Sequence, residues 1–331
     1  MKAMRRLAAF AAIASIAAVS SNLSAAAPQT DWPLQGRPVR IVVPFTAGSG
    51  SDALLRIVAK KVGEDTGAAM VIDNKPGAGT FIGAQDVARA PADGHTLLMT
   101  IVVTHTQNPH LYKKLPYDPF KDFTPEIQLV RSATVLVANK NAPFNNVREL
   151  VAYAKAHPGQ LNFGSYALGS TSHLNGEILK LRAGIDMVHV PYKGTADATQ
   201  ALLAGDVQVY FDGTATAVEN GRAGKVKLLG VAADKRIPAV PDLPTMAEQG
   251  VEGLDIVGWQ GLFAPGNLPL PVANKIVAAF RKAITSPEIV EMVRMAGNKV
   301  SGAGPEEFAA IVRRDYDRWG AVIKRAGVKL D

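Results

Sequence analysis

The chain has 331 residues, of which 47% are hydrophobic and 20% are charged, with a formal net charge of +7 and no cysteine. This length and composition allow two domains of ordinary size with their own cores. They exclude disulfide frameworks, cysteine-based metal sites, thiol nucleophiles and a lipid-modified cysteine anchor. The basic residues form no stripe with interleaved aromatic residues, which argues against nucleic-acid binding.

The first residues have the three-part pattern of a secretory signal peptide. Lys2, Arg5 and Arg6 form a basic start, residues 7–19 are apolar, and residues 20–27 are small and mostly polar or Ala. The apolar run is shorter than the roughly 20 residues that a membrane-spanning helix needs. The pattern therefore predicts a cleaved export signal rather than a membrane anchor.

We expect cleavage after Ala26, since Ser24 and Ala26 would then occupy the small-residue positions of the signal. The dipeptide Arg5–Arg6 leaves both general secretion and twin-arginine export open. Cleavage would leave 331 − 26 = 305 residues with a charge of 7 − 3 = +4. No later apolar run is long enough to span a bilayer. We expect a periplasmic protein whose mild positive charge suits an anionic ligand.

Strands and helices alternate through the first part of the expected mature chain. Continuous apolar runs with β-branched residues predict the strands, and apolar residues on one helical face predict the helices. Strands are expected over residues 39–45, 69–73 and 95–103, and helices over residues 52–63 and 81–89. This order indicates an α/β fold with mostly parallel sheets.

A second group of elements follows. Strands are expected over residues 161–165, 187–190, 207–211 and 226–232, and helices over residues 150–157, 170–183, 197–204, 271–284 and 306–326. Two unusually long extended segments, 128–138 and 254–263, are candidates for paired connections between two lobes. On that interpretation lobe one is residues 28–127 plus 256–331 and lobe two is residues 128–255. A return crossing near Ala232 is the alternative.

A small-residue turn between the first strand and the first helix is the first candidate ligand-binding segment. It is formed by Phe45, Thr46, Ala47, Gly48 and Ser49. The helix that follows would point unpaired N–H groups and the positive end of its dipole at a ligand. We expect the N–H groups of residues 47–49 to face a carboxylate. Asp52 is expected to cap its own helix rather than to contact the ligand.

A second segment repeats this arrangement before the helix expected over residues 170–183. Its candidate residues are Ser165, Tyr166, Gly169, Ser170, Thr171 and His173. Ser170 is a predicted N-cap, with or without a ligand contact. His173 is expected to be neutral near a helix N-terminus and to order the loop, with direct ligand contact as the alternative. The two turns together predict an anion held in a cleft between the lobes, at the carboxyl ends of the strands.

Four further residues are candidates for the same cleft. Thr104 and His105 follow the third strand and are expected to line the cleft floor. Gly194 and Asp212 lie where two strands of the second lobe end. Asp212 is expected to hold neighbouring backbone or a water rather than to touch an anion, because like charges repel.

Eight segments together resemble the Bug-type periplasmic solute receptors, the receptor component of tripartite tricarboxylate transporters. They are residues 32–52, 73–84, 92–99, 108–125, 164–177, 189–198, 240–250 and 258–269, which follow the family's order. The resemblance implies a two-lobed type II periplasmic binding protein fold with Venus-flytrap closure and a hinge of two crossing strands. It implies capture of a small carboxylate, without catalysis, for inner-membrane permease subunits or a sensor protein. We expect a monomer.

Ser49 departs from the family pattern, which usually has a second Gly at that position. A positive φ there would strain Ser49, whereas its hydroxyl could instead contact the ligand. The family's ligand classes leave dicarboxylates, tricarboxylates, acidic amino acids and aromatic carboxylates open.

Enzyme interpretations find little support in the sequence. The glycines between Gly77 and Gly83 resemble a dinucleotide fingerprint, but Pro76 interrupts the strand end and no ribose-binding acid is clearly placed. His173 and Glu177 are spaced for one helix face, without an evident third metal ligand. We expect no cofactor and no metal. An exported hydrolase or lyase, using Ser165 or Ser170 beside His173, is the alternative from a different class.

Overall fold

The computed structural model describes residues 31–330. The predicted signal peptide and its cleavage after Ala26 lie outside these residues. Among the residues described, none of the helices combines the length and apolar character that crossing a membrane requires.

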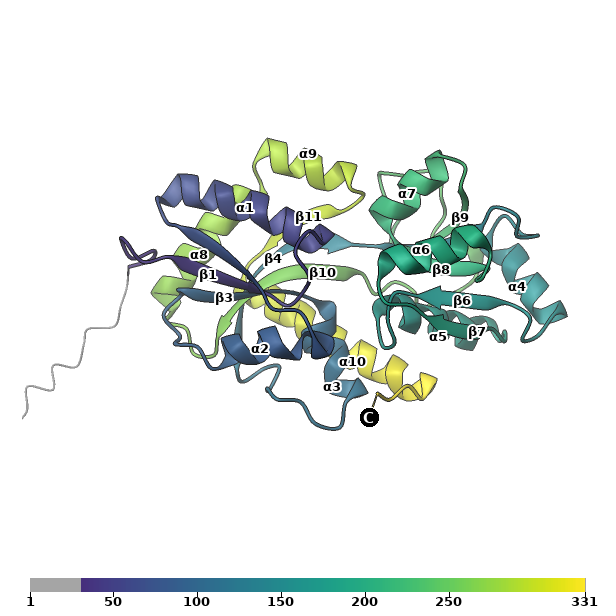
Figure 1. Ribbon diagram of the computed structural model, residues 1–331, viewed down its shortest axis with the longest axis horizontal. Coiled ribbons are helices and arrows are strands. Elements are labelled where there is room, and N and C mark those ends of the chain that lie inside the picture. Colours follow the sequence, from purple (N-terminus) through teal and green to yellow (C-terminus); the bar gives the residue numbers. More distant parts are fainter. Residues whose placement is uncertain (1–30, 331) are drawn as a thin grey trace, which may run out of the picture. The chain divides into compact units, whose positions relative to one another are not determined.

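Six strands form the first sheet (Figure 1), in the order β11-β4-β10-β3-β1-β2. Their bounds are β1 Val39–Val43, β2 Met70–Asn74, β3 Thr96–Ile101, β4 Phe123–Ser132, β10 Gly258–Pro265 and β11 Lys299–Ala303. The β1 strand pairs in parallel with β2 and β3, whereas β10 runs antiparallel to both β3 and β4. The carboxyl ends of β1 and β3 therefore lie at one edge of the sheet.

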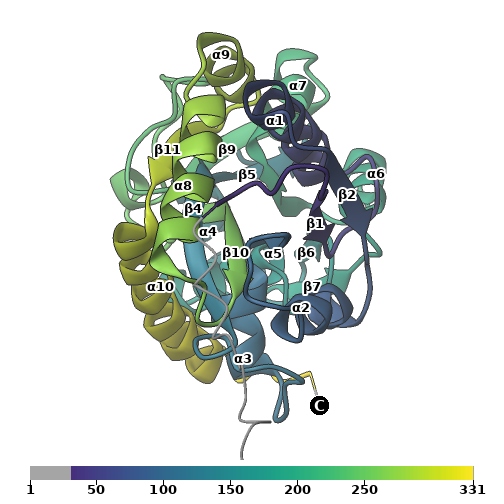
Figure 2. The same ribbon diagram turned by 90° about the vertical axis from the view of Figure 1, so that its left-hand side faces the viewer.

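Helices cover both faces of this sheet, as Figures 1 and 2 show. Ile41 and Val43 point into a core with α1 (Gly50–Thr66), α8 (Leu270–Ile284) and α9 (Pro287–Met295). Val42 lies between them in the chain and points to the opposite core, which contains α2 (Phe81–Ala88) and α10 (Pro305–Ala326). Successive side chains of a strand face opposite ways, so a fully apolar strand is buried on both sides. A 3₁₀ turn (Ala78–Thr80), a π-helix, η2 (Val103–Gln107), and a short helix, α3 (Asn108–Leu111), complete this part.

Five strands form the second sheet, in the order β7-β6-β8-β5-β9. Their bounds are β5 Thr134–Asn139, β6 Asn162–Ser165, β7 Val188–Pro191, β8 Val209–Gly213 and β9 Val226–Ala232. The helices in this part of the chain are α4 Val147–Ala156, α5 Thr171–Ala183, α6 Thr195–Ala204 and α7 Thr214–Arg222, with a 3₁₀ turn at Ala247–Gln249. The β6 and β8 strands are parallel, so their carboxyl ends also meet at one edge.

The chain passes between the sheets twice. It leaves the first sheet after Ser132 and enters the second at Thr134, then leaves the second after Ala232 and re-enters the first at Gly258. These two passages are the crossing strands of a two-lobed fold. The β4 strand stays in the first sheet as far as Ser132, and the lobe boundaries at residues 128 and 256 remain a prediction.

Both sheets are mixed, so the expectation of mostly parallel sheets was wrong. Strands that arrive from the other sheet, β10 in the first and β5 in the second, pair antiparallel with their neighbours. The sequence pattern also missed α7, α9, β11 and the start of β4 at Phe123. The β11 strand (KVSGA) has a single large apolar residue, Val300, which gives no period of two for a pattern to detect.

Helix α5 packs closely on β6 through a glycine. A Cβ atom built on Gly176 would lie 2.1 Å from Cε2 of Phe163, which is itself fully buried. The absence of a side chain therefore lets the helix approach the aromatic ring.

Glu126 is a fully buried carboxylic acid in β4. It lies where the pairing of β4 with β10 shifts register, and neither of its oxygens has a hydrogen-bond partner within residues 31–330. Burial raises the pKa of Glu126 from its ordinary value of 4.5 to about 8. The folded protein therefore holds this side chain protonated near neutral pH.

We expect Gly176→Ala to lower the free energy of unfolding by about 1–3 kcal/mol, because the new methyl group must displace the Phe163 ring. This loss would exceed the gain of about 1 kcal/mol that Ala normally brings to a helix interior. Urea denaturation measures it. Gly50→Ala is the matched control, since a Cβ there meets nothing within 4 Å. Equal stability of the two variants would contradict the close packing.

We expect Glu126→Gln to become progressively more stable than the parent protein as the pH rises from 5 to 9. The raised pKa means that the folded state keeps a proton that the unfolded state loses, so the contribution of Glu126 is fully present below pH 4.5 and is lost as the pH rises through about 8. Urea denaturation at several pH values gives the difference. The same change at exposed Glu252 is the matched control. A constant difference for Glu126→Gln would show that this carboxyl group is ionised in the folded protein.

Candidate functional site

The first predicted turn connects β1 to α1. Gly48 has φ +80°, in the left-handed region, whereas Ser49 has φ −62° and ψ 156° and is the N-cap of α1. The Ser49 hydroxyl accepts the N–H of Asp52 at 3.3 Å. Ser49 is therefore unstrained where the family usually has Gly, because the position that requires positive φ is Gly48.

The buried Asp52 side chain stabilises this turn through hydrogen bonds. It is 1% exposed, and its carboxylate accepts hydrogen bonds from the Gly48 N–H at 2.8 Å, Arg56 Nε at 2.9 Å and Asn74 Nδ2 at 2.9 Å. Burial raises the pKa of Asp52, but these hydrogen bonds outweigh it and hold the pKa at about 2. Asp52 therefore holds the loop as an anion, while Ser49 rather than Asp52 supplies the cap.

The free N–H donors of the turn agree only in part with the expected residues 47–49. The N–H of Gly48 is bound to Asp52, and the N–H of Ser49 is bound to the Thr46 carbonyl at 3.3 Å. Among the hydrogen bonds of residues 31–330, none uses the N–H of Ala47, Gly50 or Ser51. The first turn of α1 thus offers Gly50 and Ser51 as anion donors.

Thr104 and His105 lie in η2 and are fully buried. The Thr104 hydroxyl is hydrogen-bonded to the hydroxyl of Thr80 at 2.8 Å and to the hydroxyl of Thr100 at 2.6 Å. The His105 ring stacks on Phe263, with centroids 3.9 Å apart, and burial lowers its pKa to about 3. His105 is therefore a neutral, fully buried residue in this structure, and its place at the cleft floor stays a prediction.

The second predicted turn connects β6 to α5. Ser170 is the N-cap of α5, as expected, and its hydroxyl accepts the N–H of His173 at 3.3 Å. His173 Nδ1 accepts the N–H of Gly169 at 3.0 Å, so His173 orders the loop. Burial lowers the pKa of His173 to about 4, which favours a neutral ring at neutral pH.

The side chains of Tyr166 and Gln107 contact the start of α5. The Tyr166 hydroxyl interacts with Thr171 and with the N–H of Ser172, which lower its pKa, but burial raises the pKa more strongly. Gln107 is fully buried in η2, and its Nε2 donates to the Thr171 hydroxyl at 3.0 Å, while its Oε1 has no partner within the described residues. Sequence reasoning missed Gln107, although it follows Thr104 and His105 in the chain.

Asp212 ends β8 and contacts its own backbone, as expected. Its Oδ1 accepts the N–H of Gly213 at 2.7 Å, and burial raises the pKa of Asp212 to about 7. The fully buried hydroxyl of Tyr210 interacts with Asp212 and Thr195, and burial raises its pKa. Gly194 is the N-cap of α6, immediately before Thr195, with φ +130°.

The structure thus brings several predicted residues together and keeps others apart. Tyr166, Thr171 and Asp212 form one polar group at the carboxyl ends of β6 and β8, to which Gln107 adds a contact from η2. Across residues 31–330, no hydrogen bond or ion pair joins the turn 45–49 to the turn 165–173. The two predicted binding segments are therefore separately built.

The site residues do not form a hydrolytic triad. The Ser165 hydroxyl lies 2.7 Å from His189 Nε2 and 3.0 Å from the Ala167 carbonyl, and burial lowers the pKa of His189 to about 3. Glu177 Oε1 lies 3.8 Å from His173 Nε2, beyond hydrogen-bond distance, and in the part of the chain that the structure describes no carboxylate is hydrogen-bonded to His189. No cluster of His, Asp and Glu within the same residues is suited to a metal ion.

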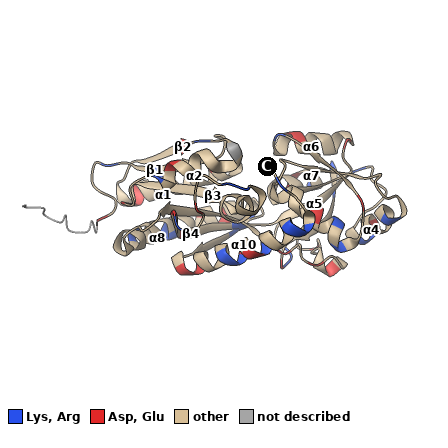
Figure 3. Ribbon diagram, turned by 90° about the horizontal axis from the view of Figure 1, so that it is seen from below, with Lys and Arg blue, Asp and Glu red and all other residues tan. Residues whose placement is uncertain are grey.

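Charge around these segments is dispersed. Figure 3 shows basic and acidic residues interspersed along α10 and the neighbouring helices. No continuous basic stripe follows any of these helices.

Comparisons with known proteins agree on one family. The family model described as "Tripartite tricarboxylate transporter family receptor" matches residues 54–328. A protein of Pseudomonas sp. strain P51, encoded in the tcbD-tcbE intergenic region, is 35% identical over 94% of this chain and 92% of its own length.

Two solved structures are similar throughout the chain. R. palustris Rpa4515 with adipate has a TM-score of 0.82 at 35% identity, covering 90% of this chain and 99% of that one. MatC of Rhodopseudomonas palustris with bound malate has a TM-score of 0.78 at 34% identity, covering 88% and 100%. These similarities confirm the two-lobed fold and the receptor, rather than enzyme, assignment. The chain belongs to the tripartite tricarboxylate transporter receptor family.

Proposed function

We propose that this receptor captures a small aliphatic dicarboxylate between its two lobes. One carboxylate is held at the start of α1, by the N–H groups of Gly50 and Ser51 together with Ala47. The other end of the ligand meets the polar group at the start of α5. Closure of the lobes follows as a shift of population toward the closed state.

The single observation that carries this proposal is the construction of the β1–α1 turn. Asp52, Arg56 and Asn74 satisfy one another and the Gly48 N–H, so the loop is held without a ligand. The Gly50 and Ser51 N–H groups are left at the positive end of a helix dipole. An anion bound there gains hydrogen bonds without the entropic cost of ordering the loop.

The start of α5 favours a different kind of contact. Tyr166 already interacts with Thr171 and Ser172, and Gln107 has a buried oxygen without a hydrogen-bond partner among the described residues. A ligand hydroxyl, a protonated carboxyl group or a bridging water can fill such a position. Relatives support the ligand class, since two of the solved structures contain the dicarboxylates adipate and malate.

We further propose that the protein works in the periplasm, with its signal peptide cleaved near Ala26, and delivers its ligand to inner-membrane permease subunits as a monomer. The basic and apolar start of the chain supports export. Family membership supports the transporter partner. The lobe boundaries at residues 128 and 256 belong to this proposal, with hinge motion at the two crossings.

We expect the purified protein to bind adipate, and Gly50→Pro to weaken that binding about tenfold, because a charge-assisted hydrogen bond from the Gly50 N–H is lost. Proline suits this first helical position, and Ser49 before it already has extended backbone. Isothermal calorimetry measures the affinity. At 100 times its Kd, adipate should add about 2.7 kcal/mol of stability.

Gly50→Ala is the control, since it keeps the N–H group and should keep the affinity. Gly50→Pro should also keep the thermal stability of the ligand-free parent. Unchanged adipate affinity in Gly50→Pro would move the carboxylate away from α1. Conversion of adipate to a product would replace the receptor proposal with an enzyme. If adipate does not bind, malate under the same conditions tests whether the chain length is wrong.

We expect Asp52→Asn to lower the free energy of unfolding by about 1–3 kcal/mol at pH 7, because a buried charge-assisted network loses its acceptor. The pKa of Asp52 is depressed from 3.8 to about 2, so its contribution is fully present above pH 3.8 and is lost only as the pH falls through about 2. Urea denaturation should therefore give the same loss at pH 5 and pH 8. Glu64→Gln, which breaks an exposed ion pair of the same helix with Lys60, should cost well under 1 kcal/mol. A comparable loss in both variants would argue against the Asp52 network.

A further inference from the structure

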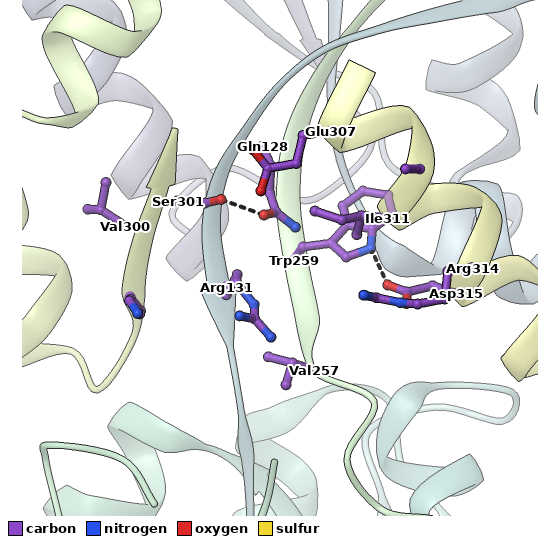
Figure 4. A pocket seen from close by; sticks show the side chains of 12 residues that line it. Gln128, Arg131, Val257, Trp259, Val300, Ser301, Glu307, Ile311, Arg314 and Asp315 are labelled. Atoms are coloured by element: carbon purple, nitrogen blue, oxygen red, sulfur yellow. Dashed lines mark hydrogen bonds and ion pairs between the residues drawn. The ribbon is translucent and has the colours of Figure 1, made fainter. Parts of the chain in front are cut away.

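One cavity of the described residues lies away from both predicted binding turns. It measures about 510 Å³ and is formed by β4, β10, β11 and α10. We call it the hinge pocket and define it by Gln128, Arg131, Trp259, Lys299, Ile311 and Arg314. Figure 4 shows Gln128, Trp259 and Arg131 on the two strands that connect the sheets, facing residues of α10. None of the fifteen ligand-binding residues predicted from the sequence lines it.

Two cations lie directly opposite each other in this pocket. Arg131 of β4 is paired in register with Lys299 of β11 on one side and with Trp259 of β10 on the other. Like charges at opposed positions of an antiparallel pair repel. The ion pair of Arg131 with Asp234 is long, at 3.9 Å, and exposed on both sides, so it compensates this repulsion only weakly.

The acidic residues of the pocket do not cancel this charge. Three cations and two acids line it, which gives 3 − 2 = +1. Asp315 is 1% exposed and is already bound to Trp259 Nε1 at 3.1 Å and to Arg314 Nη2 at 3.0 Å. Glu307, in the first turn of α10, also lines the pocket and forms no ion pair among the described residues.

Gln128 adds a polar group to the pocket. Its side chain is 1% exposed, and its Oε1 accepts the Ser301 hydroxyl at 2.5 Å. Its Nε2 forms no hydrogen bond within residues 31–330 and is not one of their fully buried atoms that lack a partner, so it is open to an acceptor from the pocket. An acceptor placed in the pocket would satisfy it.

The remaining wall is apolar and aromatic. Trp259, Ile311, Val257 and Val300 line it, and the Trp259 indole is 1% exposed. A cavity of this size with an apolar wall and a few convergent polar groups is typical of a small-molecule site.

We propose that the hinge pocket binds a small organic anion with a flat apolar body. Its acidic group meets Arg131, Lys299 and the Gln128 Nε2 donor, and its body lies against Trp259 and Ile311. The occupant would contact both β4 and β10, the strands that connect the two sheets. This site is independent of the dicarboxylate site proposed above.

Benzoate is the probe, with neutral benzamide as its matched control. The protein has three tryptophans, and Trp259→Phe identifies the indole N–H resonance of Trp259 in a two-dimensional NMR spectrum. We expect benzoate to shift this resonance saturably, also in the presence of saturating adipate, and benzamide to bind at least about tenfold more weakly because it lacks the charge.

Variants locate the anion. Arg131→Met and Lys299→Met should each weaken benzoate binding about tenfold, and Arg131→Lys should restore part of it. Lys60→Met, which removes an exposed cation of α1, should leave binding unchanged. If an Arg131 variant fails to fold, Lys299→Met at the exposed rim still decides the question.

The proposal is overturned if benzamide binds as well as benzoate, if both methionine variants keep the parent affinity, or if adipate displaces benzoate. Displacement by adipate would place benzoate in the interlobe cleft, which supports the receptor function and removes the second site. Failure of adipate to bind would leave the benzoate result unaffected, so the two proposals can fail separately.

Discussion

The antiparallel pairing of β4 with β10 is the constraint on which the rest of the structure depends. These strands continue into the two passages between the sheets, so the chain leaves the first sheet and returns to it at adjacent positions. The pairing also places β10 beside β3. It therefore holds together two sheets, each with the carboxyl ends of its parallel strands at one edge. A ligand site at those ends needs no further covalent link, such as a disulfide, between the lobes.

Different kinds of groups stabilise the two predicted binding turns. The β1–α1 turn is held by an ionised, buried carboxylate that three donors satisfy, which leaves the next N–H groups of the helix available. The β6–α5 turn is held by neutral groups: His173 accepts from Gly169, and the Tyr166 hydroxyl interacts with the start of α5. The first turn thus keeps unpaired N–H groups at a helix N-terminus, which is where our proposal places a carboxylate.

The strands that connect the sheets also carry unusual polar groups. Glu126 is buried without a partner where β4 shifts register, and five residues later Arg131 lies opposite Lys299. The buried, unpaired carboxyl group of Glu126 costs free energy, so packing alone does not account for it. The hinge motion that we propose would involve the same strands, β4 and β10, that line the hinge pocket.

The sequence by itself determined most elements and the family. Amphipathic periods located α1, α5, α8 and α10 within a few residues, and Ser170 was recognised as a cap because capping acts within three residues of the chain. The tertiary structure decided which strands are neighbours, because the hydrophobic period of β10 or β5 does not identify the strands with which it pairs. It decided the available donors as well: Arg56 and Asn74 direct Asp52 onto the Gly48 N–H, and Gln107 reaches Thr171 from η2. A local pattern records which face of an element is buried, whereas Asn74 lies 22 residues from Asp52 and Gln107 lies 64 residues from Thr171.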